Sequence, residues 1–576
     1  MHLLKHFKEL TVRPKNALEL KGLILQLAVQ GKLTANWRKE NKDVEPASEL
    51  LKRIQKEKEQ LIKEKKIKKE KSLPPITKEA IPYELPVRWI WCRLGQSGYT
   101  QTGSTPPKKN PKNYGNFIPF IGPADISNKW MKYPVDGLSE LGLSIGRLIP
   151  KNSLMMVCIG GSIGKCNVNK IDVSCNQQIN TVTPISVPVS YVKSVCQSPY
   201  FQKKVLGKSS GSATPIINKG KWEVLPFPLP PLEEQKAIVE IVETLFKEVE
   251  QLEQLTIERI ALKEKFVTSA LNQLAINNTK KEWAFLQEHF KGFFNETSNI
   301  KKLREAVLQL AVQGKLTADW RANNPDTEDA TVLLKRIQKE KTQLIKDKKI
   351  KKEKPLPFIT KDEIPYELPD GWVWCRLNEV CEYIQRGKSP KYTEIPKIPV
   401  VSQKCVQWSG FDISRAKFIT EESLDKYGEE RFLQFGDLLW NSTGNGTIGR
   451  VISFPKSNFE NVVADSHVTV VRSFKKYVLT DYLWIFTASP LIQNIVVGRV
   501  TGSTNQTELG TATVKLMEFS FPPVKEQIAI VQKVNSLMSL CDALEQQVQQ
   551  SQEQSEQLMQ SVLREVFEGK KELEEV

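Results

Sequence analysis

The chain repeats a long part of itself in register. Residues 3–94 recur at 286–377, displaced by 283 positions without an insertion or deletion. Within 25–94, 53 of 70 residues are identical to their counterparts, and LQLAVQGKLTA at 25–35 returns unchanged at 308–318. A chain built in this way is expected to make the same contact twice, because two equivalent surfaces suit two copies of one partner.

Each copy of this frame is followed by an insert and then by a weaker repeat. PPLEEQKAIV at 230–239 is answered by PPVKEQIAIV at 522–531. Between the repeats lie two stretches, about 95–229 and 378–521, that barely resemble each other. Each has the size of an ordinary domain, and 576 residues predict three or four domains in all. We therefore expect the two inserts to read two different things.

Residue usage argues against several classes of protein. No run of 18 apolar residues occurs, and the first ten residues, MHLLKHFKEL, lack the core of a signal peptide. We therefore expect a soluble, cytoplasmic protein with no membrane partner. The nine cysteines include no C-x-x-C pair, which argues against a disulfide framework and against a structural zinc site. With only four histidines, His-based catalysis or metal binding is not expected.

Positive charge is concentrated in particular segments of the chain, whose formal net charge is +17. Segments 52–71 and 335–354 each contain ten basic residues, against four and three acidic ones. Insert 90–231 has 16 basic and 5 acidic residues, whereas 378–523 has 16 and 15. A basic globular insert attracts a polyanion, most commonly nucleic acid. The two Lys-rich segments are equally well explained as solvated helix faces.

The repeated frame is predicted to be helical. Leucines recur at helical spacing over 16–31 and about 299–313, and a glycine provides each stop. Helices over 50–71 and 333–354 follow, and a proline-rich passage ends each of them.

Two long helices are predicted after the inserts. Each opens at PP.xEQ, where acidic residues complement the helix dipole, and apolar residues then alternate every four and three positions, as in a coiled coil. A single helix over 232–274 would span roughly 65 Å at about 1.5 Å per residue. We expect the two seams to pair within the chain as an antiparallel coil; a homodimeric coil is the alternative. The seam positions are Ile238, Val242, Leu245, Val249, Leu252, Leu537, Cys541, Leu544, Val548, Ser551, Ser555, Leu558 and Val562.

The inserts contain short β-rich runs punctuated by glycine, proline and asparagine. The predicted fold class is α+β: two mixed α/β domains with twisted sheets, joined by two long antiparallel coiled-coil regions in a pseudo-twofold repeat. The runs lie at 153–160, 179–187, 437–442 and 467–474. The predicted domains are 1–85, 86–231, 232–368, 369–523 and 524–576.

The order of these motifs resembles that of the specificity subunit of Type I restriction–modification systems, over nearly the whole chain. The matching residues are LREAVLQLAVQGKLTADWR at 303–321, its twin ILQLAVQGKLTANWR at 24–38, two ELP..W.W.RL openings and two PP.xEQ..IV helix starts. The resemblance implies two target-recognition domains, each of which reads one half of a bipartite site in double-stranded DNA. The helices would set the spacing between the halves.

The same resemblance implies a set of protein partners. Each repeated frame would dock one of two methyltransferase (modification) subunits, and the assembly would recruit restriction/translocase subunits. The chain itself would be non-catalytic and would hold no cofactor. One stretch departs from the family plan, because residues 276–300 add material to the central connector. Recent duplication would also explain the near-identity of the Lys-rich helices without any binding role.

Polar and basic loops of the inserts are the candidate DNA contacts. Base edges are read by Arg, Lys, Asn, Gln, Ser and Thr, while positive groups bind phosphates. The first loop pair is 102–114 and 384–392, and the second is 208–219 and 498–509. A plain surface loop would have a similar composition. The candidates are Thr102, Ser104, Thr105, Lys108, Lys109, Lys112, Tyr114, Ser212, Thr214, Lys219, Arg386, Lys388, Ser389, Lys391, Tyr392, Ser503, Asn505 and Gln506.

A third loop pair and two glycine-rich stretches remain. Gln177, Gln178 and His467 would either contact DNA or satisfy a sheet edge. GNGTIG at 444–449 matches G-x-G-x-x-G, but a strand and not a helix follows it, so it is interpreted as a turn, like GGSIGK at 160–165. No (N/D)PP(Y/F) or P-loop motif indicates a site for S-adenosylmethionine or ATP.

Three classes of function are consistent with these patterns. A DNA reader within a methyltransferase complex explains the repeat, the unequal inserts and the charge. An enzyme that acts alone on DNA would need catalytic carboxylates or a methylase motif, and the acidic residues of the second insert show no recognisable spacing. A scaffold would explain the repeat and the coils, but not the positive charge of the first insert.

Overall fold

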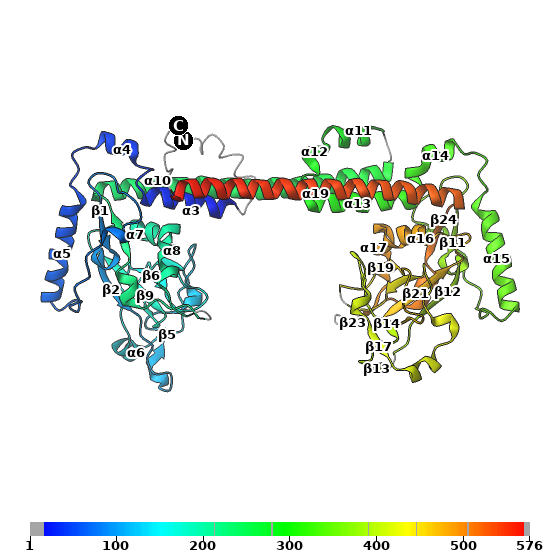
Figure 1. The fold of residues 1–576 in the computed structure, drawn as a ribbon, viewed down its shortest axis with the longest axis horizontal. Helices are drawn as coiled ribbons and strands as arrows, with labels where there is room; N and C mark the ends of the chain where they lie inside the picture. Colours follow the sequence, from blue (N-terminus) through cyan, green and yellow to red (C-terminus); the bar gives the residue numbers. More distant parts are fainter. Residues whose placement is uncertain are drawn as a thin grey trace. The chain divides into compact units, whose positions relative to one another are not determined.

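The computed structural model divides the chain into two compact units, Met1–Ile260 with Gln554–Val576, and Ala261–Glu553. Two long helices, α10 (Leu232–Asn277) and α19 (Val524–Glu568), contribute residues to both units (Figure 1). No helix in the described part of the chain is long and apolar enough to cross a membrane. The structure describes residues 16–211, 214–277, 280–389, 391–444, 446–503 and 506–568.

The repeated frame folds into the same three helices in each unit. Its first helix ends just before Gly31 or Gly314, as predicted, and both glycines have positive φ, at 70° and 67°. The frame helices are α3 (Asn16–Val29), α4 (Ala35–Glu40) and α5 (Ala47–Lys63) in the first unit, and α13 (Thr297–Val312), α14 (Ala318–Ala322) and α15 (Ala330–Lys346) in the second.

Helices α5 and α15 end at Lys63 and Lys346, so the predicted extension to residues 71 and 354 is wrong. Two residues further on, Lys65 and its counterpart Lys348 adopt left-handed backbone with φ of 59°. The Lys65 N–H donates to the Ile62 carbonyl at 3.0 Å, which closes the helix. The apolar positions end near this point, so no further turn would pack on the core.

Both inserts contain the predicted β-rich runs as central strands of one four-stranded antiparallel sheet. The strand order is β2-β9-β6-β7 in the first insert and β12-β21-β18-β19 in the second. The same topology therefore underlies two sequences that barely resemble each other. The strands are β2 (Gly98–Thr102), β6 (Leu154–Val157), β7 (Cys166–Val168), β9 (Ile179–Pro184), β12 (Cys381–Arg386), β18 (Leu438–Asn441), β19 (Val451–Ser453) and β21 (Val468–Ser473).

A short strand pair closes each insert at the frame. In the first unit, β1 (Ile90–Arg93) pairs antiparallel with β10 (Pro226–Leu229), and in the second, β11 (Val373–Arg376) pairs with β24 (Glu518–Phe521). The repeated W.W.RL motif thus pairs with the segment that precedes each PP.xEQ helix. Beyond the sheet, α7 (Val189–Gln197) and α8 (Pro199–Lys208) pack against α3, and α16 (Thr480–Ala488) and α17 (Pro490–Arg499) pack against α13.

A buried glutamate at the start of each long helix joins the frame to the helix. Glu234 accepts hydrogen bonds from the Thr34 hydroxyl at 2.6 Å and the Trp89 indole N–H at 2.8 Å, and it pairs with Arg38. Glu526 repeats every contact, with its partners Thr317 at 2.7 Å, Trp372 at 2.8 Å and Arg321. The repeated residues are therefore used first to assemble each half of the molecule.

The seam of α10 is covered by a frame helix in the first unit. Ile238, Val242 and Val249 are buried in the core to which α3 contributes, and Lys21 pairs with Glu250 at 2.7 Å. Because Arg38, which follows α3, pairs with Glu234 near the helix start, the two helices run antiparallel.

Three helices meet in the second unit. The end of α10, α13 and α19 share one apolar cluster that includes Leu271, Leu310 and Cys541. The seam of α19 therefore meets the end of α10 and α13, whereas the seam predicted at the start of α10 packs on α3 and not on the second seam. Arg304 pairs with Glu545 at 2.8 Å, while Arg321 pairs with Glu526, so α13 runs antiparallel to α19. Burial along the seam of α19 extends to Val548, whereas Ser551, Ser555 and Leu558 are exposed.

The added connector reverses the chain between α10 and α13. Its helices α11 (Lys280–Glu288) and α12 (Phe290–Phe293) fold back on α10, where the ring centroids of Phe266 and Phe293 lie 5.2 Å apart. This reversal lets α13 run parallel to the end of α10, because Lys302 pairs with Glu264 at 3.0 Å and the Lys315 ammonium donates to the Ile276 carbonyl at 3.0 Å.

Candidate nucleic-acid interface

The candidate loops gather at one edge of each central sheet. In the first insert, Thr102 at the end of β2 pairs with Asn180, and Met156 near the end of β6 pairs with both Asn180 and Cys166. Strands β2 and β6 therefore end where β9 and β7 begin. In the second insert, Thr469 near the start of β21 pairs with Arg386 at the end of β12 and with Trp440 near the end of β18. The equivalent strands therefore end at the same edge in both inserts. We call this edge, with its loops, the reading edge of each domain.

A glycine follows the first strand at both reading edges and allows a close backbone approach. A Cβ on Gly103 would lie 2.1 Å from the Asn176 carbonyl oxygen, and one on Gly387 would lie 2.0 Å from that of Ala464. Because such contacts are forbidden to any side chain, only glycine lets the first loop lie against the third. The first and third loop pairs of the sequence thus form one surface in each domain.

Loop 102–114 of the first insert is fixed at its base and exposed at its tip. The Tyr114 hydroxyl donates to the Pro106 carbonyl at 2.8 Å, and the Thr102 hydroxyl donates to Asn180 Oδ1 at 2.8 Å. Thr105 donates to Gln177, so this residue of the third loop contacts the first. Ser104 is half-buried, and Lys108, Lys109 and Lys112 are exposed.

The second loop of the first insert borders the same edge. The Gly160 N–H donates to the Pro215 carbonyl at 2.9 Å, and the Cys158 N–H donates to that of Gln178 at 2.8 Å. Thr214 is exposed here, and Ser212 lies outside the described residues. Three candidate loops therefore meet along one edge.

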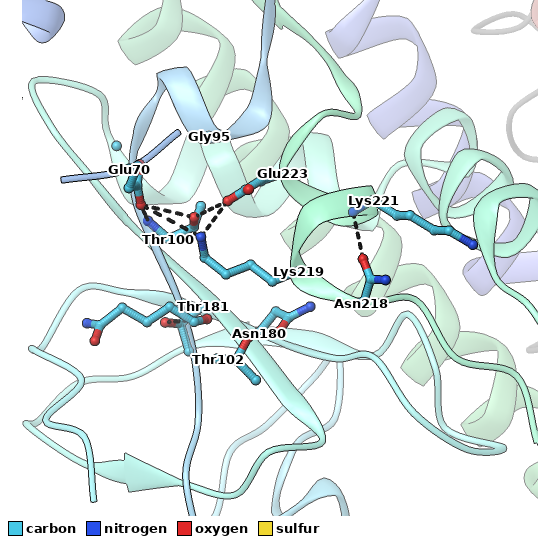
Figure 2. Close-up of polar contacts among 12 residues, drawn as sticks. Glu70, Gly95, Thr100, Thr102, Asn180, Thr181, Asn218, Lys219, Lys221 and Glu223 are labelled. Carbon is cyan, nitrogen blue, oxygen red and sulfur yellow. Dashed lines mark hydrogen bonds and ion pairs between the residues drawn. The ribbon is translucent and has the colours of Figure 1, made fainter. Parts of the chain in front are cut away.

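Lys219 differs from the other lysine candidates because its charge is paired within the molecule. Its ammonium lies 2.6 Å from the carboxylate of Glu223 and 3.9 Å from that of Glu70 (Figure 2). Glu70 comes from the Lys-rich segment after α5 and also pairs with Lys58 at 2.6 Å. The Thr100 hydroxyl donates to Glu223 at 2.6 Å. This cluster ties the frame to the insert.

The second unit repeats this junction with other partners. Glu353, which follows α15, pairs with Lys515 and accepts a hydrogen bond from the Asn378 amide at 2.7 Å. Burial acts to raise the pKa of Glu353, but the hydrogen bonds from Lys515 and Asn378 outweigh it, so the pKa lies below its usual value. Each Lys-rich segment therefore contributes structural contacts to its insert. It is neither wholly a solvated helix face nor wholly a cationic surface that is free to bind a polyanion.

The reading edge of the second insert contains paired as well as exposed candidates. Arg386 pairs with Glu508 at 2.6 Å and donates to the Leu509 carbonyl at 2.9 Å. The Ser389 and Ser466 hydroxyls lie 2.9 Å apart, and Lys388 and Lys391 are exposed. Arg386 thus links the first loop to the hairpin after α17.

The remaining candidates border the same edge. The Tyr392 ring is about half exposed and lies 4.6 Å from the Lys417 ammonium. Ser503 and Gln506 pair at the ends of strands β22 (Thr501–Ser503) and β23 (Gln506–Glu508), and Asn505 lies outside the described residues.

The third loop of the second insert is held by a buried carboxylate. Asp465 accepts the His467 N–H at 2.8 Å, and burial raises the pKa of Asp465 above its usual value. The His467 ring nitrogen Nδ1 lies 2.7 Å from the Thr443 hydroxyl, on an exposed part of the edge. The backbone of His467 therefore helps to hold the third loop, while its ring lies beside the candidate loops.

The two glycine-rich stretches are turns between strands, as predicted, and they connect β6 to β7 and β18 to β19. The sequence does not predict that these turns belong to the reading edge. Their contacts with the second and third loops depend on strand register, which no sequence signal specified.

Two stretches of the chain, 86–261 and 369–554, match the Type I restriction modification DNA specificity domain. The specificity subunit of the Type I restriction enzyme EcoAI of Escherichia coli is 29% identical, over 91% of this chain and 90% of that protein. The EcoEI specificity subunit of Escherichia coli is 27% identical, over 93% and 91%. A chain from a solved type I R-M system is 16% identical with a TM-score of 0.47, over 85% of this chain and 100% of that chain. Because the domain matches account for more than half of its length, the chain belongs to the family of Type I restriction–modification DNA specificity proteins.

Proposed function

We propose that this chain is the sequence-specificity subunit of a Type I restriction–modification complex, in which each insert reads one half of a bipartite site in double-stranded DNA. The observation that carries the proposal is the pair of reading edges. Two domains with one strand order present different polar loops at the same edge. A common scaffold with different loops suits two domains that recognise different base sequences.

The candidate side chains divide into two proposed roles. The exposed lysines, which are Lys108, Lys109, Lys112, Lys388 and Lys391, would contact phosphates, because a flexible cation suits a charged and sequence-independent target. Hydroxyl and amide groups of the same loops would contact base edges.

The repeated frame would supply the two docking surfaces for two methyltransferase subunits. The contacts around Glu234 and Glu526 are the same in both halves, so each half offers its partner an equivalent arrangement of frame helices. Restriction/translocase subunits would join through the assembled complex, and catalysis would reside in these partners. The domain boundaries proposed for this arrangement are 86–231 and 369–523 for the reading domains, with helical regions 1–85, 232–368 and 524–576, in a cytoplasmic protein.

Co-expression of the chain with its methyltransferase subunit, followed by mapping of methylated bases by single-molecule sequencing, tests the proposal. We expect a bipartite motif with a fixed gap that disappears when the chain is omitted. Methylation that does not depend on the chain, despite a stable complex, would contradict the proposal and leave a scaffold as the better explanation.

A further inference from the structure

One turn at the reading edge is kept in both inserts although the surrounding loops differ. In the first insert the turn is GGSIGK at 160–165, which contains Gly160, Ile163, Gly164 and Lys165. In the second insert it is GNGTIGR at 444–450, which is one residue longer. The first glycine has φ of 92° and 95° in the two turns, and the glycine before the basic residue has φ of 89° and 87°. The counterparts in the second insert are Gly444, Ile448, Gly449 and Arg450.

Packing explains one half of this turn. The Gln202 side-chain amide donates to the Gly164 carbonyl at 2.9 Å, and the Gln493 amide donates to that of Gly449 at 3.0 Å. A Cβ on Gly164 would lie 2.2 Å from Gln202 Oε1. The glycine before the basic residue is therefore needed to hold the turn against α8 or α17.

The other half of the turn is open and offers hydrogen-bond donors. A Cβ on Gly160 or Gly161 would meet no atom within 4 Å, and the same is true of Gly446 in the second insert. Among the residues that the structure describes, none accepts a hydrogen bond from the N–H of Gly161 or Ser162. Packing thus gives no reason for an open glycine here.

A cation stands beside these donors in the first insert. Lys165 follows Gly164 and is exposed, and it forms no ion pair with any other described residue. In the second insert Arg450 is held by hydrogen bonds to Gln407 and to the Gly446 carbonyl at 2.8 Å. The first turn therefore combines successive free N–H groups with a free positive charge, which is the arrangement that binds an oxyanion.

We propose that the turn 160–165 binds a phosphate group of the DNA backbone. The proposal rests on the proposed function. Two domains that read different sequences should differ where they contact bases and agree where they contact phosphates, because phosphates are the same at every site. The turn is one part of the reading edge that agrees, and in the first insert it carries the open N–H groups.

The test uses the full chain assembled with its methyltransferase subunits. Lys165→Ala is compared with Lys151→Ala, which removes an exposed lysine before β6, at the opposite end of the same sheet. Binding to a duplex with the mapped motif and to a scrambled duplex is measured by fluorescence anisotropy over a range of salt. We expect Lys165→Ala to weaken the affinity for both duplexes by the same factor. The slope of the logarithm of the binding constant against the logarithm of the salt concentration should fall in magnitude by about 1, and the methylated motif should not change.

A second variant tests the backbone of the turn. Gly161→Ala adds a methyl group in open space, so we expect an unchanged unfolding midpoint and a weaker affinity for both duplexes. The proposal is wrong if both variants bind like Lys151→Ala, or if Lys165→Ala changes the methylated motif. If the unsubstituted complex methylates no bipartite motif, the proposed function is wrong. The phosphate proposal is still tested in that case, because binding to the scrambled duplex does not depend on a motif.

Discussion

At the residue scale, the two buried glutamates show what the repeated residues do. The Glu234 side chain is 1% exposed and receives hydrogen bonds from a threonine, an arginine and a tryptophan. Its removal would leave those donors unpaired in the interior, and the loss of one partner of a buried ion pair is strongly destabilising. The same argument applies to Glu526.

We expect Glu234→Ala to lower the free energy of unfolding of its unit by about 3–5 kcal/mol. Glu233→Ala is the matched control, because Glu233 is the preceding residue of the same helix and its side chain is 57% exposed; a change within about 0.5 kcal/mol is expected there. Urea denaturation followed by tryptophan fluorescence measures both. Equal effects of the two substitutions would show that the buried contacts contribute nothing.

The cysteines provide a test in the alkaline range, since all nine are free and buried. Burial raises the pKa of Cys166, Cys175 and Cys381 to about 12 from 9.0. The unfolded chain releases these protons near pH 9 while the folded chain retains them, so raising the pH favours unfolding. We expect the free energy of unfolding to fall between pH 9 and 10.

Thiolate absorbance gives a direct reading of this effect. At pH 10 the thiols of the folded chain should contribute little absorbance at 240 nm, and addition of urea should release their full signal. The thiolate contribution is taken as the difference from a sample with alkylated cysteines, because tyrosinate absorbs at the same wavelength. Full thiolate absorbance before unfolding would mean that the thiols are accessible to solvent, contrary to their burial.

At the element scale, local signals in the sequence specified where helices begin and where the first helix of each frame stops. Gly31 and Gly314 end their helices because glycine adopts left-handed backbone readily. The ends of α5 and α15 were missed because a lysine occupies the left-handed position, and a lysine gives no signal for a helix end. The strands were located from their composition, but register, and with it the reading edge, depends on pairings between distant residues.

Lys65→Gly should therefore stabilise the chain, by about 1 kcal/mol, because it relieves the cost of left-handed backbone for a residue with a side chain. Lys63→Gly, two residues earlier in the last turn of α5, should instead destabilise it by about 1 kcal/mol. Thermal unfolding followed by circular dichroism distinguishes the two signs. If both substitutions destabilise the chain, α5 does not end at Lys63.

At the scale of the whole molecule, the sequence identified the loops but not their contacts. Lys219 was a candidate for DNA contact by composition, yet its partners Glu223 and Glu70 come from a helix turn and from the distant frame. Arg386 likewise contacts Glu508 across the edge. The pair with Glu223 is local, four residues apart on one helix, but the pairs with Glu70 and Glu508 form only when distant parts of the chain come together. Composition alone therefore could not separate paired from unpaired charges.

Exchange of whole segments tests the division between frame and inserts. Replacement of 378–521 by the corresponding insert of another family member should change one half of the methylated motif and leave the other half and the gap unaltered. The exchange keeps β11 in the frame, replaces its partner β24 by the corresponding strand of the new insert, and leaves the whole first insert and its reading edge unchanged.

The control exchanges the frame instead of the insert. Segment 25–94 replaces 308–377, which is possible without a change of length because the two align without a gap and share 53 of 70 residues. This exchange should leave the motif unchanged, since the frame residues assemble each half and line neither reading edge. Methylated bases mapped by single-molecule sequencing report both results. A change in both halves after the insert exchange would show that the two domains do not read independently, and a change after the frame exchange would place reading residues in the frame.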